Sequence, residues 1–329
     1  MEKRKFKILT IDGGGIKGLY SAALLSKFEE YYKVKITDHF DLICGTSTGG
    51  LIALGASLGI PMREIVSFYE NEGPKIFNEN RKRSTFGRLY LLLKQVAFKG
   101  KYQQEELKAA LTNVFGNIKL KESKNLLCIP SYNINTDIPR VFKKDYGSLR
   151  EDNEKRYVDV ALATTAAPTY FPVTEIDDSH YVDGGIWANN PILVGLFEYL
   201  YQFSDDDRFD GVEILSISSF MVDKGQIHKK TNRAFIDWKG ALFDAYSSGQ
   251  SKFAMKFIEQ LRNRLNVTLD FQRIENICCS PEQASIIDMD NASKESLKLL
   301  KTIGMQTAAH FQVKPEIVKF FNTTKTINI

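Results

Sequence analysis

Ser47 is the residue of this chain whose sequence surroundings best suit nucleophilic chemistry. It lies at the centre of residues 45–49, GTSTG, which satisfy the pattern G-x-S-x-G. The preceding residues 41–44 predict a short buried strand, and apolar residues from 51 onward predict a helix. A strand, a tight glycine turn and a helix form a nucleophile elbow, which presents the serine hydroxyl at a helix N-terminus. The alternative is a glycine-rich turn with an incidental serine, which the flanking strand and helix disfavour.

A second glycine-rich segment, DGGGIKG at residues 12–18, follows a predicted strand and precedes a predicted helix. Its glycines satisfy G-x-G-x-x-G, the pattern of a dinucleotide-binding fold, with Asp38 or Asp41 as the ribose ligand. A P-loop is excluded, because Gly18 is followed by leucine and not by Lys-Ser/Thr. The segment is therefore compatible with an oxidoreductase that binds a dinucleotide.

The same loop also has the composition of an oxyanion hole. Consecutive small residues allow the backbone N–H groups of Gly13, Gly14 and Gly15 to point at one negative charge. The loop by itself does not separate this interpretation from dinucleotide binding. The G-x-S-x-G pattern that follows favours the oxyanion hole, because an acyl-transfer site needs both parts.

A serine nucleophile also needs a base, and the four histidines are poorly placed to supply it. His228 and His310 lie beyond Asp183, but neither is in a strand-end turn that looks built for catalysis, and His39 and His180 precede the strands of the two motifs. Isolated histidines are also more often surface or packing residues. Asp183 is the remaining candidate, in an Asp-Gly-Gly that ends a predicted strand at residues 180–185. In a parallel sheet that position would place its carboxylate at the same edge as Ser47. The alternative for Asp183 is an ordinary turn aspartate.

The elements that must position these residues alternate between strand and helix. Further strands are predicted at residues 6–11, 126–133, 139–142 and 212–218. Further helices are predicted at residues 19–32, 62–69, 103–115, 157–163 and about 191–201. The last hundred residues are predicted to be mainly helical, at 233–259 and 294–303 and on through His310. We expect a catalytic domain at residues 1–225 and a helical C-terminal part at 226–329 packed on it.

The composition is that of an ordinary soluble globular protein. Of 329 residues, 43% are hydrophobic and 26% are charged, and the net charge of +4 is too small to indicate a nucleic-acid polymer as partner. No apolar run of about 18 residues predicts a transmembrane helix, and the basic N-terminus lacks the apolar core of a signal peptide. The four cysteines lack metal-ligand spacing. These features predict a cytoplasmic protein.

A basic amphipathic helix is predicted from Phe86 to Lys99. Its apolar stripe consists of Leu89, Leu92, Leu93 and Val96. Arg88, Lys94, Lys99 and Lys101 surround the stripe, and residues 81–83 add a further basic cluster. Such a helix either lies on an anionic membrane surface or packs its stripe on the core. The sequence leaves open whether the segment from Phe86 to Lys101 contacts lipid or the protein core. If it contacts lipid, the protein would be located peripherally at the inner membrane surface.

Three segments together resemble the patatin-like phospholipase family. They are residues 12–18, residues 45–49, and Asp183-Gly184-Gly185 followed by ANNP at residues 188–191. The resemblance extends from about residue 8 to residue 191 and less clearly beyond. Lys17 stands where the family usually has arginine, so a bidentate role of that side chain is not expected here.

The resemblance implies a three-layer α/β/α fold with a mostly parallel central sheet. It also implies a Ser–Asp dyad that hydrolyses lipid acyl esters without a catalytic histidine, a metal or an organic cofactor. Ser47 would be the nucleophile and Asp183 the base. The N–H groups of Gly13, Gly14 and Gly15 would form the oxyanion hole. The expected activity is that of a phospholipase A, with membrane phospholipid as the substrate.

In length and compactness the chain is also similar to the bacterial patatin-like effectors of anti-phage defence, which cyclic nucleotides activate. That similarity implies a cyclic-nucleotide activator, although no particular residue identifies its site. Two other functions remain: a dinucleotide-binding oxidoreductase and a catalytically inactive binding module. The first leaves Ser47 and Asp183 without a role. The second predicts that Ser47 does not react with a fluorophosphonate.

Overall fold

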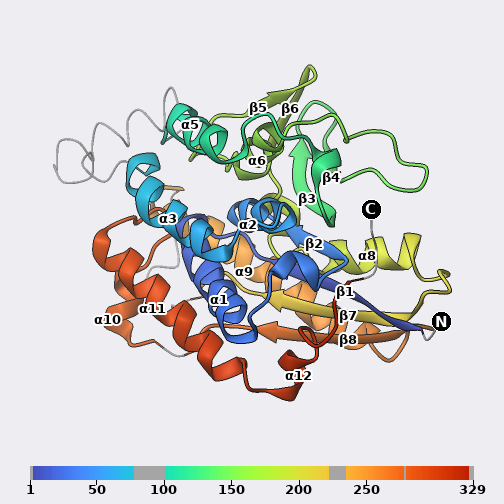
Figure 1. Ribbon diagram of the computed structural model, residues 1–329. Coiled ribbons are helices and arrows are strands. Elements are labelled where there is room, and N and C mark those ends of the chain that lie inside the picture. The colour runs from blue at the N-terminus through green and yellow to red at the C-terminus, as the bar shows by residue number, and fades with distance from the viewer. Residues whose placement is uncertain (1–2, 78–100, 222–234, 278, 326–329) are drawn as a thin grey trace.

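A central sheet with helices on both faces forms the body of the molecule, as the computed structural model shows (Figure 1). The structure describes residues 3–77, 101–221, 235–277 and 279–325, and for residues 235–244 it describes the backbone only. The predicted amphipathic helix at Phe86 to Lys99 and the basic cluster at 81–83 lie outside these residues, as does His228.

The sheet has eight strands within the described residues, in the order β5-β6-β3-β2-β1-β7-β8, with β4 paired to β3. Their bounds are β1 Arg4–Ile11, β2 Leu42–Gly45, β3 Leu126–Asn133, β4 Ile138–Phe142, β5 Thr174–Ile176, β6 Ser179–Asp183, β7 Phe209–Ile217 and β8 Thr268–Ile274. The neighbouring pairs β3–β2, β2–β1, β1–β7 and β7–β8 are parallel. Strands β4 and β6 each pair antiparallel with β3, and β5 pairs antiparallel with β6. The sheet is therefore mostly parallel, as predicted.

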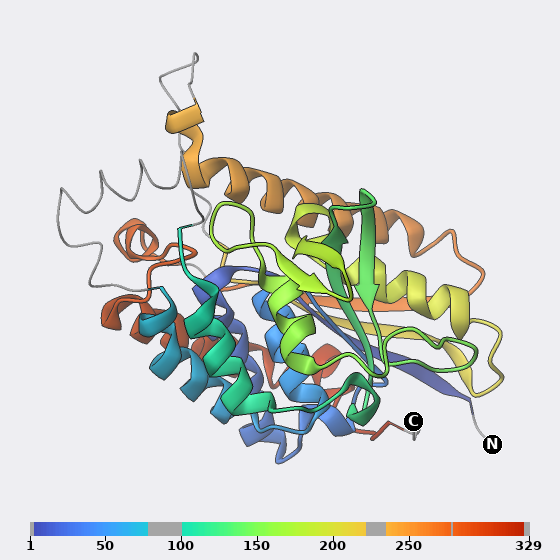
Figure 2. The same ribbon diagram turned by 90° about the horizontal axis from the view of Figure 1, so that it is seen from above.

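The inner parallel strands β3, β2, β1 and β7 are mostly buried, because their side chains alternate between two apolar cores, whereas the edge strand β8 is mainly half-buried. On β1, Leu9 and Ile11 face one core, whereas Phe6 and Ile8 face the other. The first core also contains side chains of α1 (Gly18–Tyr32), α2 (Thr48–Ser57), α3 (Met62–Ile76), α5 (Gln104–Phe115), α6 (Tyr157–Thr165) and α11 (Lys294–Phe311). The second contains side chains of α8 (Ile192–Gln202) and α9 (Phe235–Leu261). Figure 2 shows these layers from above.

The described residues also form three short α-helices, α7 (Gly185–Ala188), α10 (Pro281–Ile286) and α12 (Pro315–Val318), and 3-10 turns at Gly15–Lys17, Ile36–Asp38 and Leu120–Glu122. Register places the ends of the central strands together. Ile11 pairs with Gly45, so β1 and β2 end at the same edge of the sheet. The loops that follow β1 and β2 therefore start side by side, and these are the two glycine-rich segments.

Strand β8 was not predicted, because the C-terminal part was expected to be mainly helical. It pairs with β7 along its whole length, from Thr268 to Ile274, and so belongs to the sheet. Helix α3 is also longer than predicted. It continues through Ile76 although Pro74 lies inside it. The predicted division near residue 225 stays a prediction. In the structure, β8 belongs to the same sheet as the earlier strands, and α11 packs in the same core as the earlier helices.

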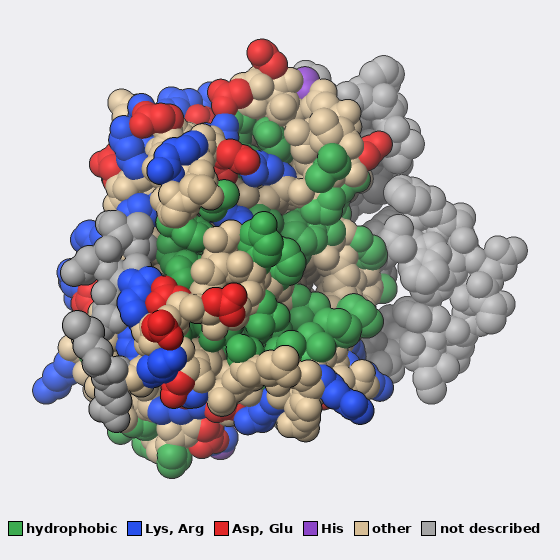
Figure 3. Space-filling model, turned by 90° about the vertical axis from the view of Figure 1, so that its right-hand side faces the viewer, with side chains coloured by type: hydrophobic (Ala, Val, Ile, Leu, Met, Phe, Trp, Pro, Cys, Tyr) green, Lys and Arg blue, Asp and Glu red, His purple; other side chains and the backbone are tan. Residues whose placement is uncertain are grey.

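One face of the molecule carries gathered hydrophobic side chains (Figure 3). On α8, Phe197 and Tyr201 are exposed and stack with ring centroids 5.8 Å apart, and on α9 Phe253 and Phe257 do the same. Among the described helices, none is both long enough and apolar enough to cross a membrane.

Candidate active site

Ser47 occupies a sharp turn between β2 and α2. Its backbone has φ 54° and ψ −125°, a conformation that costs a residue other than glycine free energy. The flanking glycines are needed because the chain approaches itself closely. A Cβ at Gly45 would lie 2.2 Å from the Gly49 carbonyl oxygen, and one at Gly49 would lie 2.3 Å from that of Ile11. The predicted nucleophile elbow has the geometry that the pattern requires.

Hydrogen bonds hold this turn from behind. The Ser47 N–H donates to the Thr164 hydroxyl at 3.0 Å, and that hydroxyl donates to the Pro130 carbonyl oxygen at 2.6 Å. On the other side, the Thr46 hydroxyl donates to the Ala188 carbonyl oxygen at 2.6 Å. These bonds fix the strained turn to α6, β3 and α7, and sequence patterns gave no sign of them.

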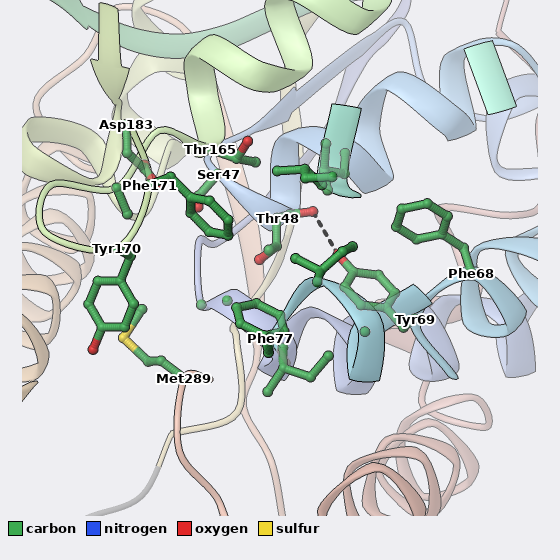
Figure 4. Close-up of a pocket in the computed structure, with 18 of the residues that line it drawn as sticks. Ser47, Thr48, Phe68, Tyr69, Phe77, Thr165, Tyr170, Phe171, Asp183 and Met289 are labelled. Atoms are coloured by element: carbon green, nitrogen blue, oxygen red, sulfur yellow. Dashed lines mark hydrogen bonds between the residues drawn. The ribbon is translucent and has the colours of Figure 1, made fainter. Parts of the chain in front are cut away.

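Asp183 reaches Ser47 from an antiparallel strand, which corrects the expected parallel arrangement. Strand β6 runs against β3, and Asp183 pairs with Ser131. Ser131 lies three residues beyond Cys128, which pairs with Cys44, and Ser47 lies three residues beyond Cys44. The returning strand therefore ends at the level of the elbow. The Ser47 hydroxyl lies close enough to the Asp183 carboxylate to lower the pKa of that carboxyl, and Figure 4 shows the two side chains next to each other.

The Asp183 carboxylate is buried, with 1% of the residue exposed. Burial raises its pKa to about 7, although hydrogen bonds from the Ser47 hydroxyl and the Gly185 N–H, the latter at 2.6 Å, favour the charged form. No cationic side chain contributes to this shift. A carboxyl with a pKa near neutrality can accept a proton and return it, which is what a general base in acyl transfer must do.

The glycine loop lies against the elbow, but its three N–H groups are not equivalent. The Gly13 N–H donates to the Asn189 carbonyl oxygen at 3.0 Å, so that predicted donor is already engaged. For Gly14 and Gly15, no acceptor is present in the described part of the chain. Gly15 has φ +60°, and a Cβ there would lie 2.2 Å from the Met289 carbonyl oxygen. Gly14 and Gly15 line the pocket at Ser47.

A buried ion pair anchors the start of this loop. Arg273 on β8 donates to both carboxylate oxygens of Asp12, at 2.8 and 2.5 Å. The same guanidinium donates to the hydroxyls of Ser216 on β7, at 2.8 Å, and Ser251 on α9, at 3.2 Å. Sequence analysis missed Arg273 because it missed β8. Residues 267–274 contain several β-branched and aromatic residues, and this composition could have revealed the strand.

Helix α9 also contacts the loop that follows Asp183. The Gln250 side-chain carbonyl accepts from the Asn189 N–H at 3.1 Å, and its amide donates to the Ile186 carbonyl oxygen at 2.9 Å. The Tyr246 hydroxyl donates to the same oxygen of Ile186. Ser251 of the same helix donates to the Asp12 carboxylate at 3.4 Å, so α9 contacts both the loop after Asp183 and the start of the glycine loop.

The pocket at Ser47 is mainly hydrophobic, and the open space in it and at its mouth amounts to about 710 Å³ (Figure 4). The polar exceptions near the serine are Asp183, Thr48, Thr165 and Asn189. Its apolar walls come from several elements: Ile16, Leu51, Phe68, Tyr69, Ile76, Phe77, Leu107, Ala167, Tyr170, Phe171 and Met289. The lining therefore offers mostly apolar contacts to a bound molecule.

An aromatic cluster and an ion pair close one side of this pocket. Tyr102 packs edge-on against Phe77, with ring centroids 5.4 Å apart, and lies 5.8 Å from Phe171. The Tyr102 hydroxyl donates to the Asp290 carboxylate at 2.6 Å, and Lys101 forms an ion pair with the same carboxylate. Lys101, expected to border the predicted basic helix, thus contributes to the pocket's surroundings.

The described histidines take no part in this site. His39 is buried and bonds through Nδ1 to the Thr323 carbonyl oxygen, at 3.1 Å, and burial lowers its pKa. His180 is exposed and contacts Asn135. His310 packs edge-on against Phe311. None of these three lines the pocket.

The candidate ribose ligands of the dinucleotide interpretation are in the wrong place. Asp38 and Asp41 precede β2, whereas the glycine loop follows β1, and the two strands are parallel. They therefore lie at the edge of the sheet opposite the loop. Asp41 is also occupied, because Arg4 binds both of its carboxylate oxygens, at 2.8 and 2.5 Å. Among the described residues, no three His, Cys, Asp or Glu side chains gather to hold a metal ion.

Comparison with known proteins agrees with this geometry. The model of the family described as patatin-like phospholipase matches residues 9–196. Proteins named cGAMP-activated phospholipase from Pseudomonas aeruginosa and Vibrio cholerae are 30% and 29% identical to the chain. These alignments cover 92% and 97% of this chain and 88% and 95% of the relatives. Patatin-like protein 2 of Arabidopsis thaliana is 27% identical, over 90% of this chain and 81% of its own length. The predicted resemblance and fold class are confirmed.

Proposed function

The chain belongs to the patatin-like phospholipase family, and from this premise we propose that it hydrolyses acyl esters of phospholipids with Ser47 as nucleophile and Asp183 as base. The observation that carries the proposal is the contact of these two side chains at an apolar pocket, with the Asp183 pKa raised to about 7 by burial. A dyad without histidine needs a carboxyl of that kind, because an ordinary aspartate is too weak a base for a serine hydroxyl.

In the proposed reaction the Ser47 Oγ attacks the ester carbonyl carbon while its proton passes to the Asp183 carboxylate. The tetrahedral intermediate then collapses, the C–O bond to the alcohol breaks, and Asp183 returns the proton to the leaving alkoxide. An acyl-enzyme and a lysophospholipid result. Water attacks the acyl-enzyme with Asp183 again as base, which releases the fatty acid and restores Ser47.

We assign the backbone donors of the oxyanion hole to Gly14 and Gly15. Both line the pocket and neither N–H has an acceptor among the described residues. Gly13 has a different role in this proposal, since its N–H and carbonyl oxygen both bond to Asn189, at 3.0 and 3.4 Å. That exchange ties the glycine loop to the loop after Asp183 and so holds base and oxyanion hole at a constant separation.

The test is lipid analysis of phospholipid vesicles treated with wild type, Ser47→Ala and Asp183→Ala. Wild type should release fatty acid and lysophospholipid, and both variants should lose nearly all of this activity while keeping their circular dichroism. Since the two side chains act as a unit, the double variant should be no slower than either single one. His310→Gln is the matched control and should retain activity. Full activity of Asp183→Ala, or no fluorophosphonate labelling of wild-type Ser47, would exclude the dyad.

We further propose that a cyclic nucleotide activates the enzyme and that it acts peripherally on membranes. The names of its bacterial relatives support the activator, and a substrate embedded in a bilayer requires contact with that surface. Helix α9 bonds to the loop after Asp183 and to Arg273, which holds the glycine loop. A nucleotide bound to the C-terminal part, residues 226–329, could change the geometry of the site through these contacts. Titration with cGAMP during vesicle hydrolysis tests activation, and vesicle flotation tests membrane binding.

A further inference from the structure

Thr48 has a buried hydroxyl without a hydrogen-bond partner beside the nucleophile. The residue is 8% exposed, it lines the pocket, and its Oγ1 meets no polar atom at hydrogen-bonding geometry within the described part of the chain. In Figure 4 the side chain points into the same space as Ser47. Buried hydroxyls are almost always paired in folded proteins, so an unpaired one at a pocket wall needs an explanation.

The neighbouring Tyr69 hydroxyl does not supply the missing partner. It donates to the Thr48 backbone carbonyl oxygen at 3.2 Å, which uses its proton. The two side chains are close enough for Thr48 to oppose the rise that burial causes in the Tyr69 pKa. The geometry between their oxygens is nevertheless not that of a hydrogen bond, and Oγ1 stays unsatisfied.

Thr48 is also the first residue of α2, a helix of ten residues. Its N–H is one of the N-terminal amides that have no partner inside the helix, and none is present elsewhere among the described residues. The positive end of the helix dipole lies here as well. Amide, hydroxyl and dipole thus converge where Ser47 would place a developing negative charge.

We propose that Thr48 is a catalytic residue whose hydroxyl donates a hydrogen bond to the oxyanion of the tetrahedral intermediate. It complements the backbone donors of Gly14 and Gly15, which line the same pocket. The oxyanion supplies the partner that Oγ1 lacks in the free enzyme. The inference rests on the proposed serine hydrolase mechanism, and it extends that mechanism with a side-chain donor.

This role predicts an unusual combination of effects. An unsatisfied buried hydroxyl destabilises the folded state, so replacing it with a methyl group of the same shape should not lower stability. Loss of a donor to the oxyanion should slow catalysis, because the bond forms only in the transition state. A merely structural hydroxyl would show the reverse: lower stability with little effect on turnover.

The experiment compares Thr48→Val and Thr48→Ser with wild type on a soluble ester. Thr48→Val should lower kcat about 100-fold with little change in KM, since oxyanion donors contribute on that scale. Its denaturation midpoint should be no lower than that of wild type. Thr48→Ser keeps the donor and should retain most of the turnover. Phosphonylation of Ser47 should slow in Thr48→Val as well, because that reaction develops charge on an oxygen in the same place.

Thr10 provides the matched control. Its hydroxyl is also buried and unpaired among the described residues, but it lies on β1 near Gly195 of α8 and does not line the pocket. Thr10→Val should change stability in the same direction as Thr48→Val and leave kcat unchanged.

Wild-type kcat in Thr48→Val would overturn the inference, as would an equal loss in Thr48→Ser. A loss in Tyr69→Phe as large as that in Thr48→Val would assign the hydroxyl to Tyr69 instead. These outcomes leave the dyad intact, whereas full activity of Ser47→Ala would overturn the proposed function itself.

Discussion

Arg273 and Asp12 form a buried ion pair across 261 residues of sequence, which joins the last strand of the sheet to the first residue of the glycine loop. The guanidinium is 8% exposed and the carboxylate 2%. The pair is bidentate, and bonds to Ser216 and Ser251 occupy further donors. Such a contact fixes the loop in direction as well as in distance.

Removing either partner alone should leave a buried charge without compensation. Asp12→Asn and Arg273→Gln should each lower the free energy of unfolding by about 3–5 kcal/mol, measured by urea denaturation. The double variant should recover part of that stability. Its kcat/KM should stay well below wild type, because the glycine loop has lost its anchor. A double variant with wild-type kcat/KM would show that the pair serves the fold and not the site.

The pH dependence of the reaction should report the carboxyl group. As the proposed base, Asp183 must be deprotonated to accept the serine proton, and burial raises its pKa to about 7. We therefore expect kcat/KM on a soluble ester to rise with pH through a midpoint near 7 and then to level off. A flat profile between about pH 5 and 8 would contradict a base of this pKa.

The same burial makes Asp183 unfavourable for stability at neutral pH. Because its pKa rises from 3.8 to about 7 on folding, the folded state holds the proton more tightly, and stability falls as pH rises across that interval. An amide side chain at this position would not titrate. Asp183→Asn should therefore be more stable than wild type at pH 8, by a few kcal/mol on the order of the pKa shift, and by less at pH 5. Equal unfolding free energies at both pH values would refute this account.

Gly14 should tolerate no side chain unless its neighbour gives way. A Cβ at Gly14 would lie 2.6 Å from the Ser219 Cβ and 2.9 Å from its hydroxyl oxygen. Gly14→Ala should thus displace the loop and cost roughly 3 kcal/mol of transition-state stabilisation, measured as kcat/KM. Adding Ser219→Gly removes the clash and should restore part of the loss. If the second change restores nothing, the methyl group acts on the oxyanion directly and not through loop position.

The strained backbone at Ser47 should be visible in stability. Ser47→Ala and Ser47→Gly both remove the hydroxyl, but only glycine relieves the strain of φ 54°, and that relief must exceed the extra backbone entropy that glycine loses on folding. Ser47→Gly should be the more stable by about 1 kcal/mol or more. The comparison uses thermal or urea unfolding of two inactive proteins. Equal or lower stability of Ser47→Gly would show that the strain is no larger than the entropy that glycine loses on folding.

The amino-acid sequence by itself determined the local elements of the site. The two glycine-rich turns, the strands before them and the helices after them lie where short-range patterns predicted, since apolar runs and tight turns depend on neighbouring residues. Asp183 was also found from sequence, at the end of its strand. The reason given for it was wrong, because β6 is antiparallel and strand direction depends on distant pairing.

Only the tertiary structure decided how these parts cooperate. The Gly13 N–H, an expected oxyanion donor, bonds to Asn189 in this structure, and the Thr48 hydroxyl has no partner among the described residues. Arg273 reaches Asp12 only because β8 completes the sheet beside β7. Each of these depends on which distant groups are brought together and which are shielded from water. That outcome follows from packing of the whole chain, so no local pattern in the sequence records it.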